Sequence, residues 1–261
     1  MKAILVTGAA SGIGRATALL FSRRGFKVGC YDVDVEGARR VAEEIDAAAG
    51  KGTSRHGRID VTNEESWTSA LDDFEAHAHR LDVLFNCAGI LRTGRFEDVP
   101  PAECRKQLDV NVMGVVLGVQ KSLPLLERTA AEHGESVVVN MSSASATYGQ
   151  PELAVYSATK FAVRALTEAL DVELAGRKIR VCDVMPGYVD TPMVATQTHT
   201  PKSLDRLGVN LTAEGVAETV WKAAHGRGLH YIPQVNVALM NRLGGLLPEL
   251  GRAVTRRIAK R

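Results

Sequence analysis

Three residues in the segment 143–160 could together move a proton on and off a substrate oxygen. Tyr156 and Lys160 stand four positions apart, so on a helix they lie on one face, one turn from each other. A lysine ammonium beside a phenol favours the phenolate and predicts a lowered tyrosine pKa. The hydroxyl of Ser143, brought up from a neighbouring loop, could hydrogen-bond the same substrate oxygen. The set indicates acid–base chemistry at an alcohol or carbonyl, although a tyrosine–lysine pair at this spacing also occurs by chance on helix surfaces.

A glycine-rich turn near the N-terminus predicts a dinucleotide site. It follows the apolar run 3–6, contains Gly8, Gly12 and Gly14, and precedes an amphipathic helix. The glycines permit a tight turn and close backbone approach, and the helix N-terminus offers free N–H groups to a pyrophosphate. The spacing is GxxxGxG rather than GxGxxG, but the physical reasons are shared. No GK[ST] sequence occurs, which argues against a P-loop nucleotidase.

An acidic residue at the end of the second expected strand favours NAD(H) over NADP(H). Asp32 follows Gly14 at about the offset where a carboxylate meets the adenosine ribose. There it would accept hydrogen bonds from the 2′-hydroxyl and repel a 2′-phosphate. Val33 and Asp34 add no cation. Arg15 leaves one alternative open, because it is either a solvated residue of the first helical turn or a phosphate ligand.

Strands and helices alternate along the chain, which predicts a doubly wound, Rossmann-like α/β fold with a central parallel sheet between helices. We expect strands near 3–7, 27–31, 55–59, 81–85, 135–140, 178–184 and 229–231, and helices near 12–24, 35–48, 63–79, 101–131, 155–175 and 213–225. Ligands of such sheets lie beyond the carboxyl ends of the strands. No repeat, low-complexity tract or linker interrupts the sequence, so residues 1–261 are expected to form a single dinucleotide-binding and catalytic domain.

Composition fits a globular enzyme and excludes several other classes. Hydrophobic residues make up 45% of the chain, charged residues 24%, and the net charge of +2 gives no reason to expect nucleic-acid binding. The four cysteines include no CxxC pair, and the chain leads directly into its first strand, so we expect a cytoplasmic protein without a signal peptide. No apolar run has the length of a membrane span. No metal site is expected, since HExxH is absent and His77 and His79 do not share a helical face.

With these features the chain resembles the short-chain dehydrogenase/reductase family over nearly its whole length. The resemblance is carried, in the family's order and spacing, by TGAASGIG at 7–14, Asp32, Asp60-Val61, NCAG at 86–89, Asn111, Ser143, Tyr156, Lys160 and PGYVDTP at 186–192. Cys87 departs from the family's usual NNAG. Because cysteine is small and often buried, we expect little change in packing there.

The resemblance implies an oxidoreductase that transfers a hydride between NAD(H) and a secondary alcohol or ketone, with Asn111, Ser143, Tyr156 and Lys160 as catalytic residues. Asn111 would kink its helix and hold a water on the proton path to Lys160. Without the resemblance, the same residue is equally interpreted as an amide that hydrogen-bonds within its own helix. Lys160 would also hold the nicotinamide ribose, Asp60-Val61 would lie by the adenine, and Val189 and Thr191 by the nicotinamide. The implied cofactor-binding residues are Gly8, Ser11, Gly12, Ile13, Gly14, Asp32, Asp60, Val61, Asn86, Ala88, Gly89, Tyr156, Lys160, Pro186, Gly187, Val189 and Thr191.

The sequence limits the substrate only to a broad chemical class. The segment 191–208 is expected to cap the site as a loop and a short helix, in which His199 is either a substrate contact or a solvated residue. The opposite wall is expected to hold Tyr148, Gln150, Glu152 and Leu153. A medium-sized secondary alcohol or ketone fits, and steroid-like, sugar-like and acyl substrates stay open. Two alternatives are an NADPH-dependent ketoreductase of acyl thioesters and a non-catalytic NAD-binding regulatory protein.

Apolar residues in two helices and in the C-terminal extension indicate contacts beyond the central sheet. The helices near 101–131 and 155–175 have apolar residues beyond those needed against the sheet, namely Val115, Val119, Leu166 and Leu170. By resemblance these helices form a two-fold interface, so a homodimer or homotetramer is expected. In the extension 233–261, apolar residues recur at helical spacing among basic ones. Packing against the body or a partner subunit is favoured there over peripheral membrane contact.

Overall fold

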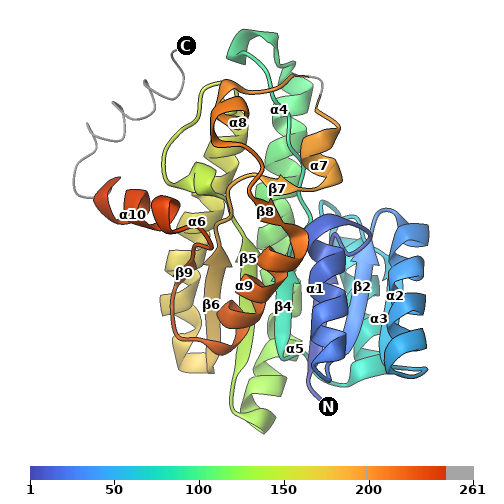
Figure 1. Cartoon of the computed structure of the whole chain (residues 1–261). Helices are drawn as coiled ribbons and strands as arrows, with labels where there is room; N and C mark the ends of the chain where they lie inside the picture. Colours follow the sequence, from blue (N-terminus) through green and yellow to red (C-terminus); the bar gives the residue numbers. More distant parts are fainter. Residues whose placement is uncertain (198, 245–261) are drawn as a thin grey trace.

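Seven parallel strands form the central sheet of the computed structural model, which describes residues 1–197 and 199–244 (Figure 1). The strands are β1 (Ala3–Thr7), β2 (Lys27–Asp32), β3 (Ser54–Arg58), β4 (Val83–Asn86), β5 (Ser136–Met141), β6 (Ile179–Val184) and β9 (His230–Tyr231). Their order is β3-β2-β1-β4-β5-β6-β9. The order reverses between β1 and β4, and a crevice for ligands opens at such a switch point. The doubly wound fold predicted from the alternation of elements is confirmed.

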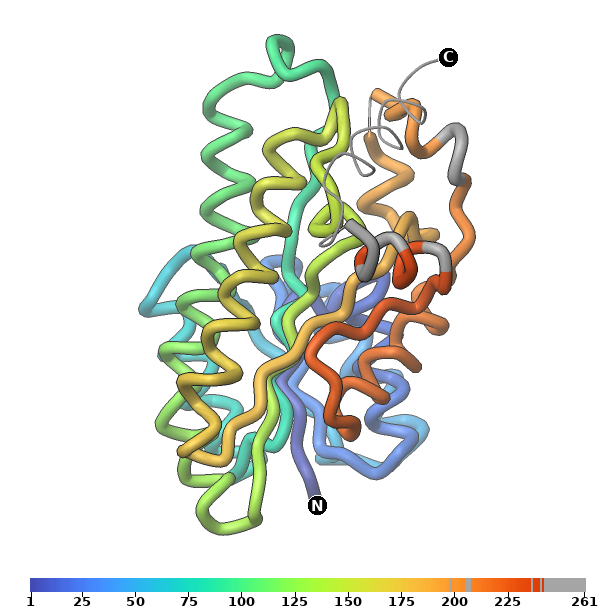
Figure 2. The backbone as a smooth tube through the Cα atoms, turned by 90° about the vertical axis from the view of Figure 1, so that its left-hand side faces the viewer, coloured from blue at the N-terminus to red at the C-terminus, as the bar shows by residue number. Residues whose placement is uncertain are grey.

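Two layers of helices cover the sheet, as Figure 2 shows. One face carries α1 (Gly12–Arg23), α2 (Val35–Ala49) and α9 (Ala213–His225). The other carries α3 (Glu64–Ala78), α5 (Gly114–His133) and α6 (Ala154–Leu174). Side chains of β1 alternate between the layers, with Ile4 and Val6 in one core and Leu5 in the other. Burial on both faces explains why these strands are continuously apolar.

The helix expected over 101–131 is divided in the structure. It consists of α4 (Pro101–Leu108), one π-helical turn at Asp109–Met113 and α5. A π turn holds one residue more than an α turn and often occurs at functional sites. Here it contains Asn111. The helix then passes close to the loop after β3, because a Cβ on Gly114 would lie only 2.8 Å from Val61 Cγ2.

The segment above the carboxyl ends of the strands holds more structure than expected. It contains β7 (Val189–Asp190), α7 (Pro192–Ala195), α8 (Lys202–Leu207) and β8 (Leu211–Thr212), and β7 pairs with β8. The single short helix expected in 191–208 is therefore two helices.

The C-terminal extension is described only through α10 (Val235–Gly244). The hypotheses for the basic, apolar stretch beyond it fall on 245–261, outside the described residues. In the part of the chain that the structure describes, no helix is long and apolar enough to cross a membrane.

Candidate active site

A cavity of about 880 Å³ lies at the carboxyl ends of the strands and brings most of the predicted site residues together. It extends from the glycine turn to the lid elements. The predicted residues that line it are Gly8, Ser11, Gly12, Ile13, Gly14, Asp32, Asp60, Val61, Ala88, Gly89, Ser143, Tyr156, Lys160, Pro186, Gly187, Val189 and Thr191.

The glycine turn leaves no room for side chains and presents a helix N-terminus to the cavity. Gly8 has a φ of +71°, and a Cβ there would lie 3.0 Å from the Ala88 backbone. A Cβ on Gly14 would lie 2.0 Å from the Gly8 carbonyl oxygen. Ser11 caps α1 without a side-chain hydrogen bond, so the first N–H groups of the helix are not occupied by its hydroxyl. The turn and helix thus fit a pyrophosphate.

Asp32 is held in place by the backbone. Its carboxylate accepts hydrogen bonds from Ala10 N at 2.9 Å and from Asp34 N at 3.0 Å. A fixed carboxylate at the cavity wall suits a ribose diol. Arg15, the alternative phosphate ligand, pairs instead with Glu44 at 2.7 Å and is not among the described residues that line the cavity.

Ser143 follows β5 and begins a short turn, Ala144–Ala146. Its Oγ accepts a hydrogen bond from Ser145 N at 3.1 Å. Ala144 N donates to Pro186 O at 2.8 Å, which joins this turn to the loop after β6. The serine is buried, and its position is therefore set by two strand ends at once.

Lys160 is a buried cation one helical turn after Tyr156. Only 5% of the residue is exposed, and its Nζ donates to Met141 O at 2.8 Å. Burial lowers the pKa of Lys160 to about 8, while the charges of Cys87 and Asp183 act in the opposite direction. The Nζ lies over the Tyr156 ring, 5.6 Å from its centroid.

The pKa of Tyr156 differs from the sequence expectation. Burial raises it to about 12; the hydrogen bond with Ser143 lowers it and the charge of Tyr188 raises it further. The expected lowering by Lys160 is wrong for this structure, because burial disfavours the phenolate and the ammonium bonds the Met141 carbonyl. The phenol therefore keeps its proton near neutral pH.

Asn111 and Asn86 lie behind the cavity rather than in its lining. The Asn111 amide accepts from Ile90 N at 2.8 Å and donates to Ile90 O at 2.9 Å and to Thr159 Oγ1 at 3.2 Å. It thus ties the loop after β4 to α6, instead of bonding only within its own helix. The Asn86 amide donates to Asn140 Oδ1 at 3.0 Å.

The lid region contains contacts that the sequence did not reveal. Gln234 lines the cavity, and its Oε1 accepts from Gly187 N at 2.8 Å. The Tyr188 hydroxyl lies 2.6 Å from Ser203 Oγ and 3.3 Å from Gln150 Oε1, which joins α8 to the opposite wall. No motif marks these residues, because they meet only through the path of the folded chain.

Glu152 was expected in the cavity wall together with Tyr148, Gln150 and Leu153. The other three line the cavity, whereas Glu152 does not. Its carboxylate accepts from Lys202 N at 2.9 Å and lies 3.3 Å from His199 Nε2. His199 therefore faces a carboxylate of the loop before α6, and both residues hold the lid rather than line the site.

The fold and the site together define an oxidoreductase of the Rossmann type. Residues 2–202 match the family model described as short chain dehydrogenase, and the chain belongs to this family.

Two dehydrogenases and two solved structures are similar to this chain. The chain is 38% identical to cyclopentanol dehydrogenase of Comamonas sp. (strain NCIMB 9872) over 77% of its length and 78% of the relative's. It is 38% identical to 3-alpha-(or 20-beta)-hydroxysteroid dehydrogenase of Mycobacterium tuberculosis (strain H37Rv), over 74% and 70%. The structure of 3-ketoacyl-(acyl-carrier-protein) reductase from Brucella melitensis with NADH is 33% identical, with a TM-score of 0.80 and coverage of 88% and 96%. That of alcohol dehydrogenase from Thermococcus sibiricus with 5-hydroxy-NADP is 25% identical, with a TM-score of 0.78 and coverage of 89% and 95%.

Proposed function

We propose that this protein is an NAD(H)-dependent dehydrogenase that interconverts a secondary alcohol on an aliphatic ring and the corresponding ketone. The observation that carries the proposal is that Ser143, Tyr156 and Lys160 line the same cavity as the glycine turn and Asp32. The names of the two relatives describe dehydrogenases of ring alcohols, cyclopentanol and hydroxysteroids. Apolar side chains of the wall and lid, Leu153, Met193 and Val237, supply surface for such a ring.

The proton moves at the Tyr156 hydroxyl. In the direction of ketone reduction, the protonated phenol donates to the oxygen as it becomes an alkoxide. Ser143 donates a hydrogen bond to the same oxygen, where negative charge develops. A bound nicotinamide supplies or accepts the hydride. Because burial keeps the phenol protonated, alcohol oxidation requires loss of that proton and should speed up as the pH rises.

Asp32 supports the choice of NAD(H). The two backbone N–H groups that bond its carboxylate hold it in the cavity wall, where a ribose 2′-hydroxyl could donate to it and a 2′-phosphate would be repelled. The glycine turn would hold the pyrophosphate, Asp60 and Val61 the adenine, and Lys160, Val189 and Thr191 the nicotinamide riboside.

A homodimer is part of the proposal. Of the residues expected at its interface, Leu166 and Leu170 of α6 are half-buried. Val115 and Val119 are buried inside the monomer, so they are not available for an interface. On α6, Phe161 is 40% exposed and Val172 is 78% exposed. Because they are eleven residues apart, about three turns, they lie on the same side of the helix. Leu108 and Met113 are also exposed, at the ends of α4 and the π turn. We expect α6 to meet its two-fold mate through contacts that include these four exposed side chains.

The direct test is a turnover screen with NAD⁺ or NADP⁺ and a panel of ring alcohols, linear alcohols and a 3-hydroxyacyl thioester, read by nicotinamide absorbance. The ring alcohols with NAD⁺ should give the highest kcat/KM. Preference for the thioester would favour the alternative function, a ketoreductase of acyl thioesters. The similar structure from Brucella melitensis carries the name of such a reductase. Coenzyme binding without turnover of any compound would contradict the proposal and favour a regulatory protein.

A further inference from the structure

A row of polar side chains crosses the sheet at the level of the catalytic helix. Asn86, Asn140, Asp183 and His230 occupy matched register positions in β4, β5, β6 and β9. Asn140 Nδ2 donates to Thr167 Oγ1 of α6 at 3.0 Å. In strands that are otherwise mostly apolar, this row gives α6 fixed hydrogen-bonding partners and so helps to define its position on the sheet.

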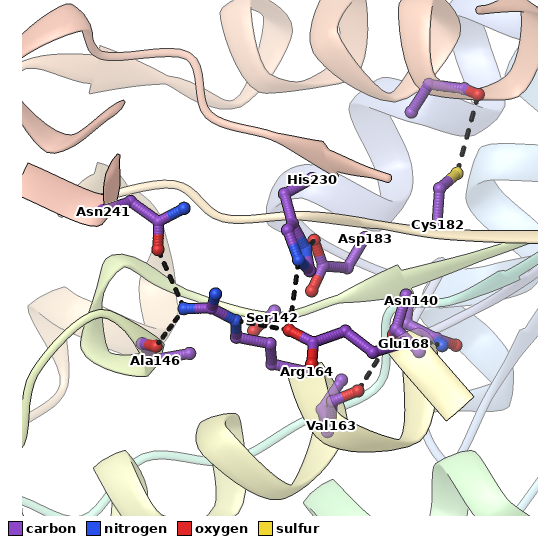
Figure 3. A network of polar contacts seen from close by, with 12 residues as sticks. Asn140, Ser142, Ala146, Val163, Arg164, Glu168, Cys182, Asp183, His230 and Asn241 are labelled. Atoms are coloured by element: carbon purple, nitrogen blue, oxygen red, sulfur yellow. Dashed lines mark hydrogen bonds and ion pairs between the residues drawn. The ribbon is translucent and has the colours of Figure 1, made fainter. Parts of the chain in front are cut away.

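His230 lies between two carboxylates at the end of this row, as Figure 3 shows. Its Nδ1 is 2.9 Å from Asp183 Oδ1, and its Nε2 is 3.2 Å from Glu168 Oε1 on α6. A neutral imidazole donates from only one nitrogen, whereas an imidazolium donates from both. An imidazolium is therefore the form that donates to both carboxylates at once.

The surrounding charges favour that form. The residues with charged side chains that face His230 are Asp183 of β6 and Glu168 and Arg164 of α6; Asn241 of α10, next to Arg164, is neutral. The hydrogen bond with Asp183 raises the pKa of His230 above its ordinary value, and the charges of Asp183 and Glu168 act in the same direction; burial and the charge of Arg164 oppose this rise without cancelling it. Asp183 is 0% exposed, and burial raises its pKa while His230 opposes this. The imidazolium is thus the counter-ion of a buried carboxylate.

The same array reaches the turn that begins at Ser143. Arg164 Nε donates to Glu168 Oε1 at 2.8 Å, and its Nη1 donates to Ala146 O at 3.1 Å. Ala146 is the last residue of that turn. Arg164 is also one helical turn after Lys160. The array therefore joins the turn that carries the serine to the helix that carries the tyrosine and lysine.

We propose that His230 is a positioning residue: as an imidazolium bridging Asp183 and Glu168, it fixes α6 and, through Arg164, the Ser143 turn in the mutual placement that proton transfer requires. The catalytic part of this inference rests on the proposed function. Loss of the imidazolium proton at alkaline pH removes the hydrogen bond from His230 to one of the two carboxylates, so the link between α6 and β9 loosens as the pH rises through the raised pKa of His230.

The protonation state can be measured without any activity. Long-range ¹H–¹⁵N spectra of the histidine side chains in the full chain should show both ring nitrogens of His230 protonated at pH 7. The exposed His133, at the end of α5, provides the internal comparison. A His230 ring that carries a single proton at pH 7 would overturn the proposal.

The positioning role is tested with His230→Gln and the matched control His133→Gln. Hydrogen exchange of the backbone over 144–147 should quicken in His230→Gln and stay unchanged in the control. In the catalysed reaction, kcat of His230→Gln should fall about 10-fold or more, since slight misplacement can cost up to about 10²-fold. KM for NAD⁺ should be nearly unchanged. Loss of the His230 proton should lower kcat, against the rise with pH expected from Tyr156, and this lowering should be absent from His230→Gln. Unchanged exchange and kcat in His230→Gln would contradict the inference.

Two further variants keep the test decisive if His230→Gln folds poorly. Adding Asp183→Asn to His230→Gln removes the unpaired buried carboxylate, so the double variant should melt at a higher temperature than His230→Gln alone. Arg164→Gln removes the link to Ala146 without touching the buried pair, and should quicken exchange over 144–147 in the same way. An unmodified protein without turnover would contradict the proposed function alone, because the spectra and exchange rates would still decide the role of His230.

Discussion

Replacement of Asp32 by alanine should weaken NADH binding selectively. The side chain is a carboxylate that two backbone N–H groups hold at the cavity wall, at 2.9 Å and 3.0 Å. A hydrogen bond from the ribose 2′-hydroxyl to such a charged acceptor contributes about 1.5–3 kcal/mol. That corresponds to about 10- to 150-fold in Kd at 25 °C. NADPH should lose little or even bind better, because the carboxylate that repels its 2′-phosphate is gone.

Titration calorimetry with NADH and NADPH measures both effects on the full chain. Asp34→Ala is the matched control: its side chain caps α2 by accepting from Gly37 N at 3.0 Å and does not line the cavity. It should lower stability by about 1 kcal/mol and leave both affinities unchanged. Equal or tighter binding of NADPH by the unmodified protein would refute the role of Asp32 and favour Arg15 as a phosphate ligand.

Three other changes have definite expected outcomes. Asn111→Ala removes the amide that ties Ile90 to Thr159, so the free energy of unfolding in denaturant should fall by about 1–3 kcal/mol. Asn63 caps α3 by accepting from Ser66 N at 2.8 Å, and a smaller fall in Asn111→Ala than in Asn63→Ala would contradict the role of Asn111. The Lys160 pKa of about 8 lies below the ordinary 10.5, so the unfolded chain binds more protons between these values and the unfolding free energy should rise with pH in this window. This rise in unfolding free energy should be missing from Lys160→Met. If the unfolding free energies of Lys160→Met and the unmodified protein changed with pH in parallel, burial of Lys160 would not be the cause of the rise. Phe161→Glu should give a monomer in analytical ultracentrifugation, whereas Phe96→Glu, at an even more exposed phenylalanine outside α6, should not; a dimer that survives the first change does not use this face of α6.

The residues at strand ends could be predicted from sequence because their positions follow from topology alone. In a parallel sheet the carboxyl ends of the strands meet at one edge, so Gly8, Asp32, Ser143 and Gly187 had to converge there once the strands were recognised. The glycine turn could also be predicted from sequence, since the exclusion of Cβ atoms from a tight turn is a local steric property.

Other features depend on packing and could not be read in advance. The π turn at Asp109–Met113 adds one residue, which rotates the following helical faces by about 100°. Val115 and Val119, which follow this turn, lie inside the core although the pattern assigned them to a surface. The pKa of Tyr156 depends on how fully the surrounding loops bury it, and a sequence gives no measure of burial.

Contacts between distant segments also escaped prediction. Gln234 meets Gly187, and His230 meets Asp183, only because β9 adds to the edge of the sheet beside β6. A two-residue strand carries too weak a pattern to fix its register. The partners of the lid, Glu152 and Lys202 among them, are set by loop geometry in the same way.

The measurement that tests the central claim most directly is the kcat of Tyr156→Phe in oxidation of the preferred alcohol. The change removes one hydroxyl and leaves the ring, so kcat should fall by about 10²–10⁴-fold, as expected for a general acid–base group. NADH affinity should be nearly unchanged. Tyr31→Phe, whose hydroxyl bonds Asp73 outside the cavity, should retain full turnover. Near-full turnover by a folded Tyr156→Phe protein would contradict the assignment of Tyr156 and with it the proposed mechanism.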